Sequence, residues 1–135
     1  LLFAPTAQPL QTTLPAPDWQ LTCERTNFVE TGRYAEAVAF CKKLEQASPF
    51  ARVVTYGKSP EGREMVALVL SKEKAFTPKD AQKSKKPLVF INNGIHSGEI
   101  EGKDADLILA RDIRVTKTKA DLLNTVNIVI IPVFS

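Results

Sequence analysis

Residues 87–102 read PLVFINNGIHSGEIEG, in which a continuous apolar run leads directly into a polar turn that contains two glycines. An uninterrupted apolar run such as residues 87–92 is typical of a strand buried on both faces. The turn covers residues 93–99, residues 100–113 have the apolar spacing of a helix, and residues 126–134 form a second apolar strand. Strand, helix and strand in this order predict a right-handed crossover between two parallel strands.

The chain upstream of this stretch contains a further helix and two further strands. Residues 33–47 place apolar side chains at steps of three and four, which predicts an amphipathic helix. Residues 52–56 and 64–71 have strand composition and flank the turn-forming sequence GKSPEG, residues 57–62, so they predict a hairpin. Downstream, residues 118–124 are expected to add a short helical turn.

The polar turn holds the residue pair that points to chemistry. His96 is the only histidine of the chain, and Glu99 follows three residues later, where the turn becomes a helix. Gly94 and Gly98 permit the backbone angles that would bring both side chains to one point. Zinc accepts imidazole nitrogen and carboxylate oxygen, so the pair is a candidate half of a metal site. The alternative is a surface histidine beside a glutamate favoured by the helix dipole.

Four segments of the chain resemble the zinc carboxypeptidase family of the carboxypeptidase A type, and they occur in the order of that family. They read VETGRYAEAVAFCKKLEQASP, YGKSPEGREMVALVLS, PLVFINNGIHSGEIEGKDA and VNIVIIPVFS. The resemblance runs from about residue 26 to residue 135. It implies an α/β fold with a mixed sheet between two helical layers, a three-layer α/β/α arrangement of which this chain would be the amino-terminal part.

The resemblance also implies an activity and a cofactor. The family hydrolyses the carboxyl-terminal peptide bond of a peptide or protein, and its first histidine and its glutamate ligand to Zn2+ fall on His96 and Glu99. Its third ligand, a histidine, and its general base belong to later segments, so no catalytic residue is assigned within this chain. Glu101 is interpreted as a solvated helix residue. Asn92 and Asn93 are candidates to orient the metal turn by hydrogen bonds, or else simply cap their own turn.

Two other functions stay open for the protein. Related zinc deacylases, which cleave N-acyl amino acids, use a similar His-x-x-Glu turn, although the upstream segments favour a peptidase. The other hypothesis is that the protein is a non-catalytic remnant that binds peptide. In each case the expected partner is a peptide or an acylated amino acid.

Composition excludes two classes of partner. The net charge of +3 is too small and too scattered to suggest nucleic-acid binding. The sequence contains no run of 18 or more apolar residues, so no membrane span is predicted. The densest basic stretch, residues 79–86, reads KDAQKSKK and is expected to be a solvated loop.

The ends of the chain predict a fragment with a leader. Residues 1–25 are rich in proline and are expected to be a poorly ordered leader or signal-peptide remnant, which favours a secreted or periplasmic protein; residues 26–135 would be part of the catalytic domain. The chain closes on an apolar strand, so we expect an unpaired sheet edge. Cys23 and Cys41 would permit one disulfide, but the position of Cys41 on the predicted helix favours a small buried side chain.

Overall fold

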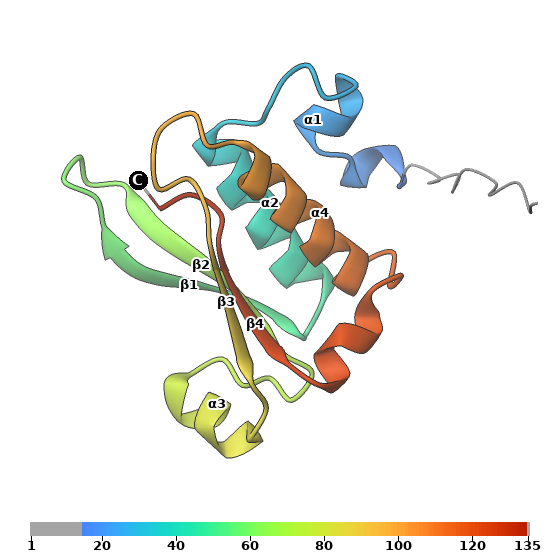
Figure 1. Ribbon diagram of the computed structural model, residues 1–135, viewed down its shortest axis with the longest axis vertical. Coiled ribbons are helices and arrows are strands. Elements are labelled where there is room, and N and C mark those ends of the chain that lie inside the picture. The colour runs from blue at the N-terminus through green and yellow to red at the C-terminus, as the bar shows by residue number, and fades with distance from the viewer. Residues whose placement is uncertain (1–14, 135) are drawn as a thin grey trace, which may run out of the picture.

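The computed structural model describes residues 15–134, which contain one mixed sheet of four strands (Figure 1). The strands are β1 (Ala51–Lys58), β2 (Glu64–Leu70), β3 (Leu88–Asn92) and β4 (Asn127–Ile131), in the order β1-β2-β4-β3. β1 pairs with β2 and β2 with β4 in antiparallel fashion, whereas β3 and β4 are parallel. The predicted hairpin, crossover and α/β mixed sheet are therefore confirmed.

Two helices, α2 (Tyr34–Ala47) and α4 (Glu101–Arg114), cover one face of the sheet and enclose the core (Figure 1). Both match the predicted ranges to within one residue. The side chains that they and the strands bury include Leu44, Leu68, Leu70, Leu107, Ile113 and Ile130. Burial of one such side chain contributes about 1.5–3 kcal/mol, so this layer holds much of the stability of the described region.

α2 and α4 have 14 residues each. A helix needs about 20 apolar residues to cross a bilayer. No helix within residues 15–134 is long and apolar enough to do so.

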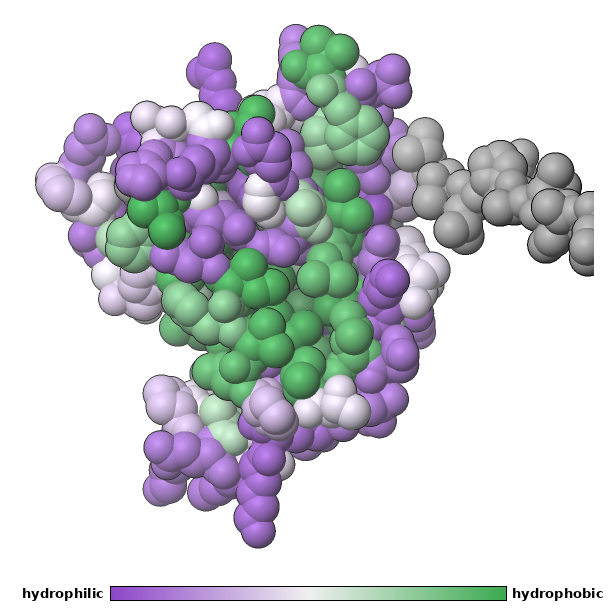
Figure 2. Space-filling view, in the orientation of Figure 1, coloured by the Kyte–Doolittle hydropathy of each residue, from purple (hydrophilic) through white to green (hydrophobic). Residues whose placement is uncertain are grey.

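β3 lies at the edge of the sheet, and this corrects the expectation that it is buried on both faces. Leu88, Val89 and Phe90 are exposed, the last to 58%. Figure 2 shows hydrophobic side chains gathered across the middle of the visible face, over the sheet. The apolar run correctly predicted a strand, but within residues 15–134 only one strand pairs with it.

The lysine-rich stretch forms a helix, α3 (Pro78–Ser84), so the prediction of a solvated loop is wrong. Thr77 caps its amino end, because the Thr77 hydroxyl accepts a hydrogen bond from the Asp80 N–H at 3.2 Å. Pro78 occupies the first turn, where its missing N–H costs nothing. Lys85 adopts the left-handed conformation that ends the helix. These residues are sequence signals for a helix, but the run of charged residues had favoured the prediction of a loop.

The described part of the predicted leader is folded. A 3-10 turn η1 (Pro17–Trp19) and the short helix α1 (Thr22–Arg25) pack beside α2 and α4, with Leu21 and Cys23 in the core cluster. The prediction of poor order is therefore wrong for residues 17–25, because they bury apolar side chains. Residues 1–14, the rest of that leader, lie outside the described residues.

The two cysteines do not form a disulfide. Cys23 and Cys41 are both free and buried. Burial raises the pKa of the Cys41 thiol to about 12. The expectation that Cys41 serves as a small buried side chain is confirmed.

Candidate metal site

The candidate site is the turn between β3 and α4, at the carboxyl end of β3. Gly94 and Gly98 have backbone φ values of +57° and +99°, which residues with a Cβ rarely adopt. The turn closes with a hydrogen bond from the Glu99 N–H to the His96 carbonyl oxygen, at 3.2 Å. Because Glu99 lies two residues before α4 begins at Glu101, both side chains are held close to the amino end of that helix.

The His96 and Glu99 side chains point toward each other, as the sequence predicted. His96 Nδ1 lies 2.7 Å from Glu99 Oε1, and the backbone N–H of His96 donates to Glu99 Oε2 at 3.1 Å. These hydrogen bonds lower the pKa of the Glu99 carboxyl below its usual value. Both side chains are solvent accessible, with 78% and 53% of their surfaces exposed. Glu99 is therefore an ionised carboxylate beside an imidazole nitrogen, and a ligand from solution can reach both.

The pair fits part of a zinc site. Two ligand atoms on a tetrahedral zinc ion, each at about 2.0–2.1 Å, are about 3.3 Å apart. The Nδ1 and Oε1 atoms are slightly closer than this, so small side-chain rotations would suffice for both to bind one ion. Within residues 15–134, no group of three or more His, Cys, Asp or Glu side chains could hold a metal. The described region thus offers two donors of the three or four that zinc requires.

Asn93 joins the start of the turn to α4 and β4. Its side-chain amide donates a hydrogen bond to the Asp106 carboxylate, and its backbone N–H donates to the Ile131 carbonyl at 3.0 Å. A Cβ added at Gly102 would overlap Asn93 Oδ1, so only glycine leaves room for this side chain. Asn93 contacts neither candidate ligand; it fixes the backbone that leads to them.

Asn92 and Glu101 make no contact with the candidate ligands among the interactions of the described residues. Asn92 is paired in register with Ile131, and its Oδ1 atom is buried without a hydrogen-bond partner within residues 15–134. Glu101 is exposed in the first turn of α4, as expected of a solvated helix residue.

Three polar residues near the turn were missed by the sequence analysis. Lys103 and Asp104 lie in the first turn of α4 and bind each other, and Thr31 binds both of them from the chain segment before α2. A signal for Lys103 does exist, because it is spaced four residues from Leu107 and seven from Ala110 on the buried stripe of α4. No local pattern points to Thr31.

The mixed sheet and the helical layer define an α/β protein, and the imidazole–carboxylate turn is its candidate metal site. The family model for "Zinc carboxypeptidase" matches residues 37–135. The chain therefore belongs to the zinc carboxypeptidase family, as the sequence resemblance implied. No curated protein sequence matches the chain.

Solved structures with similar folds include two carboxypeptidases. Carboxypeptidase A from Helicoverpa armigera is 28% identical with a TM-score of 0.64, and a metallo-carboxypeptidase from Burkholderia cenocepacia is 25% identical with a TM-score of 0.60. Each match covers 76% of this chain but only 24% and 26%, respectively, of those proteins. Bovine thrombin-activatable fibrinolysis inhibitor, solved with a tick carboxypeptidase inhibitor, is 20% identical with a TM-score of 0.60; the match covers 77% of this chain and 31% of that one. This last likeness supports the fold alone. The chain spans about a quarter to a third of the length of these proteins.

Proposed function

We propose that the protein containing this chain is a zinc-dependent metallocarboxypeptidase that hydrolyses carboxyl-terminal peptide bonds, with His96 and Glu99 as two of its zinc ligands. One observation carries the proposal: within the family match, His96 Nδ1 and Glu99 Oε1 converge to 2.7 Å on an exposed turn. Because the chain spans only part of the length of similar proteins, the activity belongs to the complete protein.

The residues of this chain would hold and orient the metal. Zinc, when bound, polarises a scissile carbonyl and lowers the pKa of a water molecule. Glu99 would contribute a carboxylate that its hydrogen bonds keep ionised, and His96 would contribute an imidazole nitrogen. Asn93 would keep the turn in register with β4 and α4 through its bonds to Ile131 and Asp106. Asn92 is proposed as a second orienting residue on its position beside the turn alone.

The described residues would not be sufficient for catalysis. A catalytic zinc site has three protein ligands and an open position for water, and a general base must accept the proton of that water. Since His96 is the only histidine of the chain, the histidine that serves the family as third ligand has no counterpart here. We expect residues 1–135 on their own to have little or no peptidase activity. Robust zinc-dependent release of carboxyl-terminal residues by this chain alone would contradict that expectation.

Metal analysis of the full-length protein tests the proposal directly. His96→Ala is expected to abolish stoichiometric zinc, whereas Glu101→Gln, on the exposed first turn of α4, serves as the matched control and should retain it. Unchanged zinc content in His96→Ala would exclude His96 as a ligand. Hydrolysis of a blocked dipeptide, compared with an N-acyl amino acid, separates a peptidase from a deacylase. Stoichiometric zinc without turnover of either substrate would indicate a binding protein.

We propose a secreted or periplasmic location. The apolar start of the chain and Ala7, a small residue suited to a signal cleavage site, support it. These residues lie outside the described part of the structure. Fractionation of the producing cells, with the mature amino terminus determined by mass spectrometry, tests this location.

A further inference from the structure

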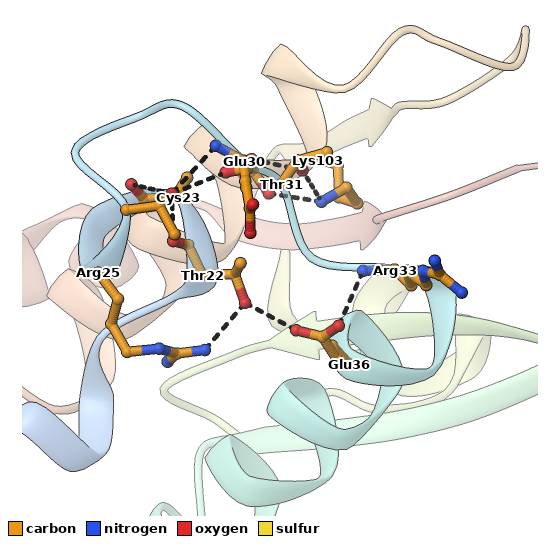
Figure 3. Close-up of polar contacts among 10 residues, drawn as sticks. Thr22, Cys23, Arg25, Glu30, Thr31, Arg33, Glu36 and Lys103 are labelled. Atoms are coloured by element: carbon orange, nitrogen blue, oxygen red, sulfur yellow. Dashed lines mark hydrogen bonds and ion pairs between the residues drawn. The ribbon is translucent and has the colours of Figure 1, made fainter.

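Thr31, Lys103 and Asp104 form a closed set of hydrogen bonds, which we call the Thr31 cluster. Figure 3 shows Thr31 and Lys103 of this cluster. The Thr31 hydroxyl donates to Asp104 Oδ2 at 2.7 Å and accepts from Lys103 Nζ at 2.6 Å. Lys103 Nζ also donates to Asp104 Oδ1, at 2.5 Å. Thr31 comes from the segment that precedes α2, so the cluster joins parts of the chain more than 70 residues apart.

The cluster lies within one helical turn of the candidate ligands. The Asp104 N–H donates to the Ile100 carbonyl oxygen at 3.2 Å, and Ile100 is bonded directly to Glu99. Lys103 also lines a cavity of about 170 Å³ together with His96 and Glu99. A shift of the first turn of α4 would therefore move the backbone that carries the Glu99 carboxylate.

Burial restricts the positions that the Lys103 and Asp104 side chains can adopt. Only 6% of the Lys103 side chain and 16% of the Asp104 side chain are exposed. A buried ammonium ion without hydrogen-bond partners is unstable, so alternative positions of these side chains are strongly disfavoured. The first turn of α4 is consequently held from outside the helix, by a residue of the amino-terminal segment.

We infer that the Thr31 cluster positions the metal turn, so that Thr31 and Lys103 set the affinity of the His96–Glu99 pair for zinc without contacting the ion. This inference rests on the proposed function of that pair. Residues that support metal ligands from outside typically change metal affinity about 10- to 100-fold when they are replaced. The amino-terminal segment would thereby act on the metal site as well as on stability.

A second link between the same two parts of the chain provides the control. Glu24 Oε2 accepts a hydrogen bond from Arg111 Nη1 at 2.6 Å, and Arg111 lies two turns further along α4 than Lys103. This link also ties the amino-terminal segment to α4, but far from the metal turn. The double variant Glu24→Gln/Arg111→Met removes it and leaves no charge at either position; the partly exposed Asp112 loses only its 3.1 Å contact with Arg111 Nε.

The test compares Thr31→Val and Lys103→Met with the double variant, in the full-length protein. Zinc affinity is measured by competition with a chelator. Hydrogen exchange of the Glu99 and Asp104 amides is measured in the metal-free protein, where these amides donate to His96 and Ile100. Thr31→Val and Lys103→Met should each weaken zinc binding at least about 10-fold and speed exchange at both amides. Thr31→Ser, which keeps the hydroxyl, should restore both properties.

The double variant should retain zinc affinity and exchange rates even where its melting temperature falls. An equal loss of zinc affinity in the double variant would show that the Thr31 cluster affects zinc only through overall stability, against the inference. Unchanged zinc affinity and exchange rates in Thr31→Val and Lys103→Met would also overturn it. If the wild-type protein binds no zinc, the proposed function fails. The exchange measurement would then still show whether the cluster orders the turn.

Discussion

Paired side chains at the two ends of α4 differ in their exposure to solvent. At its amino end, His96 and Glu99 are exposed and bind each other across 2.7 Å. Near its carboxyl end, Arg111 and Glu24 bind each other at a similar distance, but only 4% and 5% of their side chains are exposed. The distances alone do not distinguish a site from a structural tie, whereas exposure does.

The difference follows from the cost of removing charge from water. A buried pair must keep its partner, because either charge left alone would lose its solvation without compensation. An exposed pair can exchange its mutual hydrogen bond for water or for a metal ion at small cost. The chain thus has a fixed tie near the carboxyl end of α4 and an exchangeable pair in the turn that precedes α4.

The largest expected effect breaks the buried end. Glu24→Ala removes the most buried partner of the Arg111 guanidinium and leaves it the partly exposed Asp112 carboxylate at 3.1 Å, so the free energy of unfolding should fall by about 3 kcal/mol, near the lower end for a broken buried ion pair. Urea denaturation measures this. Glu61→Ala removes the exposed partner of Arg63 and is the control, with little change expected. Similar, small losses in both variants would contradict the contrast between buried and exposed pairs.

A smaller effect is expected at the amino end of α4, where Gly102 faces Asn93. Gly102→Ala would normally stabilise a helix, but here the added methyl group overlaps Asn93 Oδ1. Overpacking of this kind costs about 1–3 kcal/mol, measured by thermal or urea unfolding. In the double variant Asn93→Ala/Gly102→Ala the overlap is gone, so the two substitutions should be clearly non-additive. Additive effects would show that Asn93 does not restrict this position.

Asp106, between the two ends, should make stability depend on pH. Burial raises the pKa of its carboxyl above the usual 3.8, despite a hydrogen bond from Asn93 that acts in the opposite direction. The folded protein therefore holds this proton more tightly than the unfolded chain. The associated stability is fully present below the unfolded pKa and is lost as pH rises through the folded pKa.

Asp106→Asn should abolish that loss. Urea midpoints of the wild type and the variant, measured between about pH 3.5 and 6.5, should diverge as pH rises, with the variant relatively more stable at the upper end. A constant difference across this range would show that Asp106 titrates alike in the folded and unfolded states.

The smallest effect concerns the buried thiols beside the helical layer. Cys41 has a pKa of about 12, and burial also raises the pKa of Cys23, so neither is a reactive thiolate at pH 8. A thiol reagent should label both only after unfolding, with no effect of a reductant on stability. Fast labelling of the folded protein would show that the amino-terminal segment opens readily from α2 and α4.

Several features of the fold and site followed from the sequence because their signals are local. The spacing of apolar residues predicted α2 and α4, and the spacing of His96 and Glu99 predicted that their side chains converge. Helical periodicity and a three-residue turn depend on neighbours along the chain. Thr77 and Pro78 also provide local signals for α3, but the charge of the neighbouring lysines favoured the prediction of a solvated loop.

The sequence by itself thus determined which segments become helices and strands, and where an imidazole and a carboxylate meet, because these depend on residues a few positions apart. Only the tertiary structure decided that β3 lies at an edge, that residues 17–25 join the core, and that Thr31 holds the first turn of α4. Those features arise when parts of the chain up to about 90 residues apart exclude water from one another, and no local pattern encodes which parts will meet.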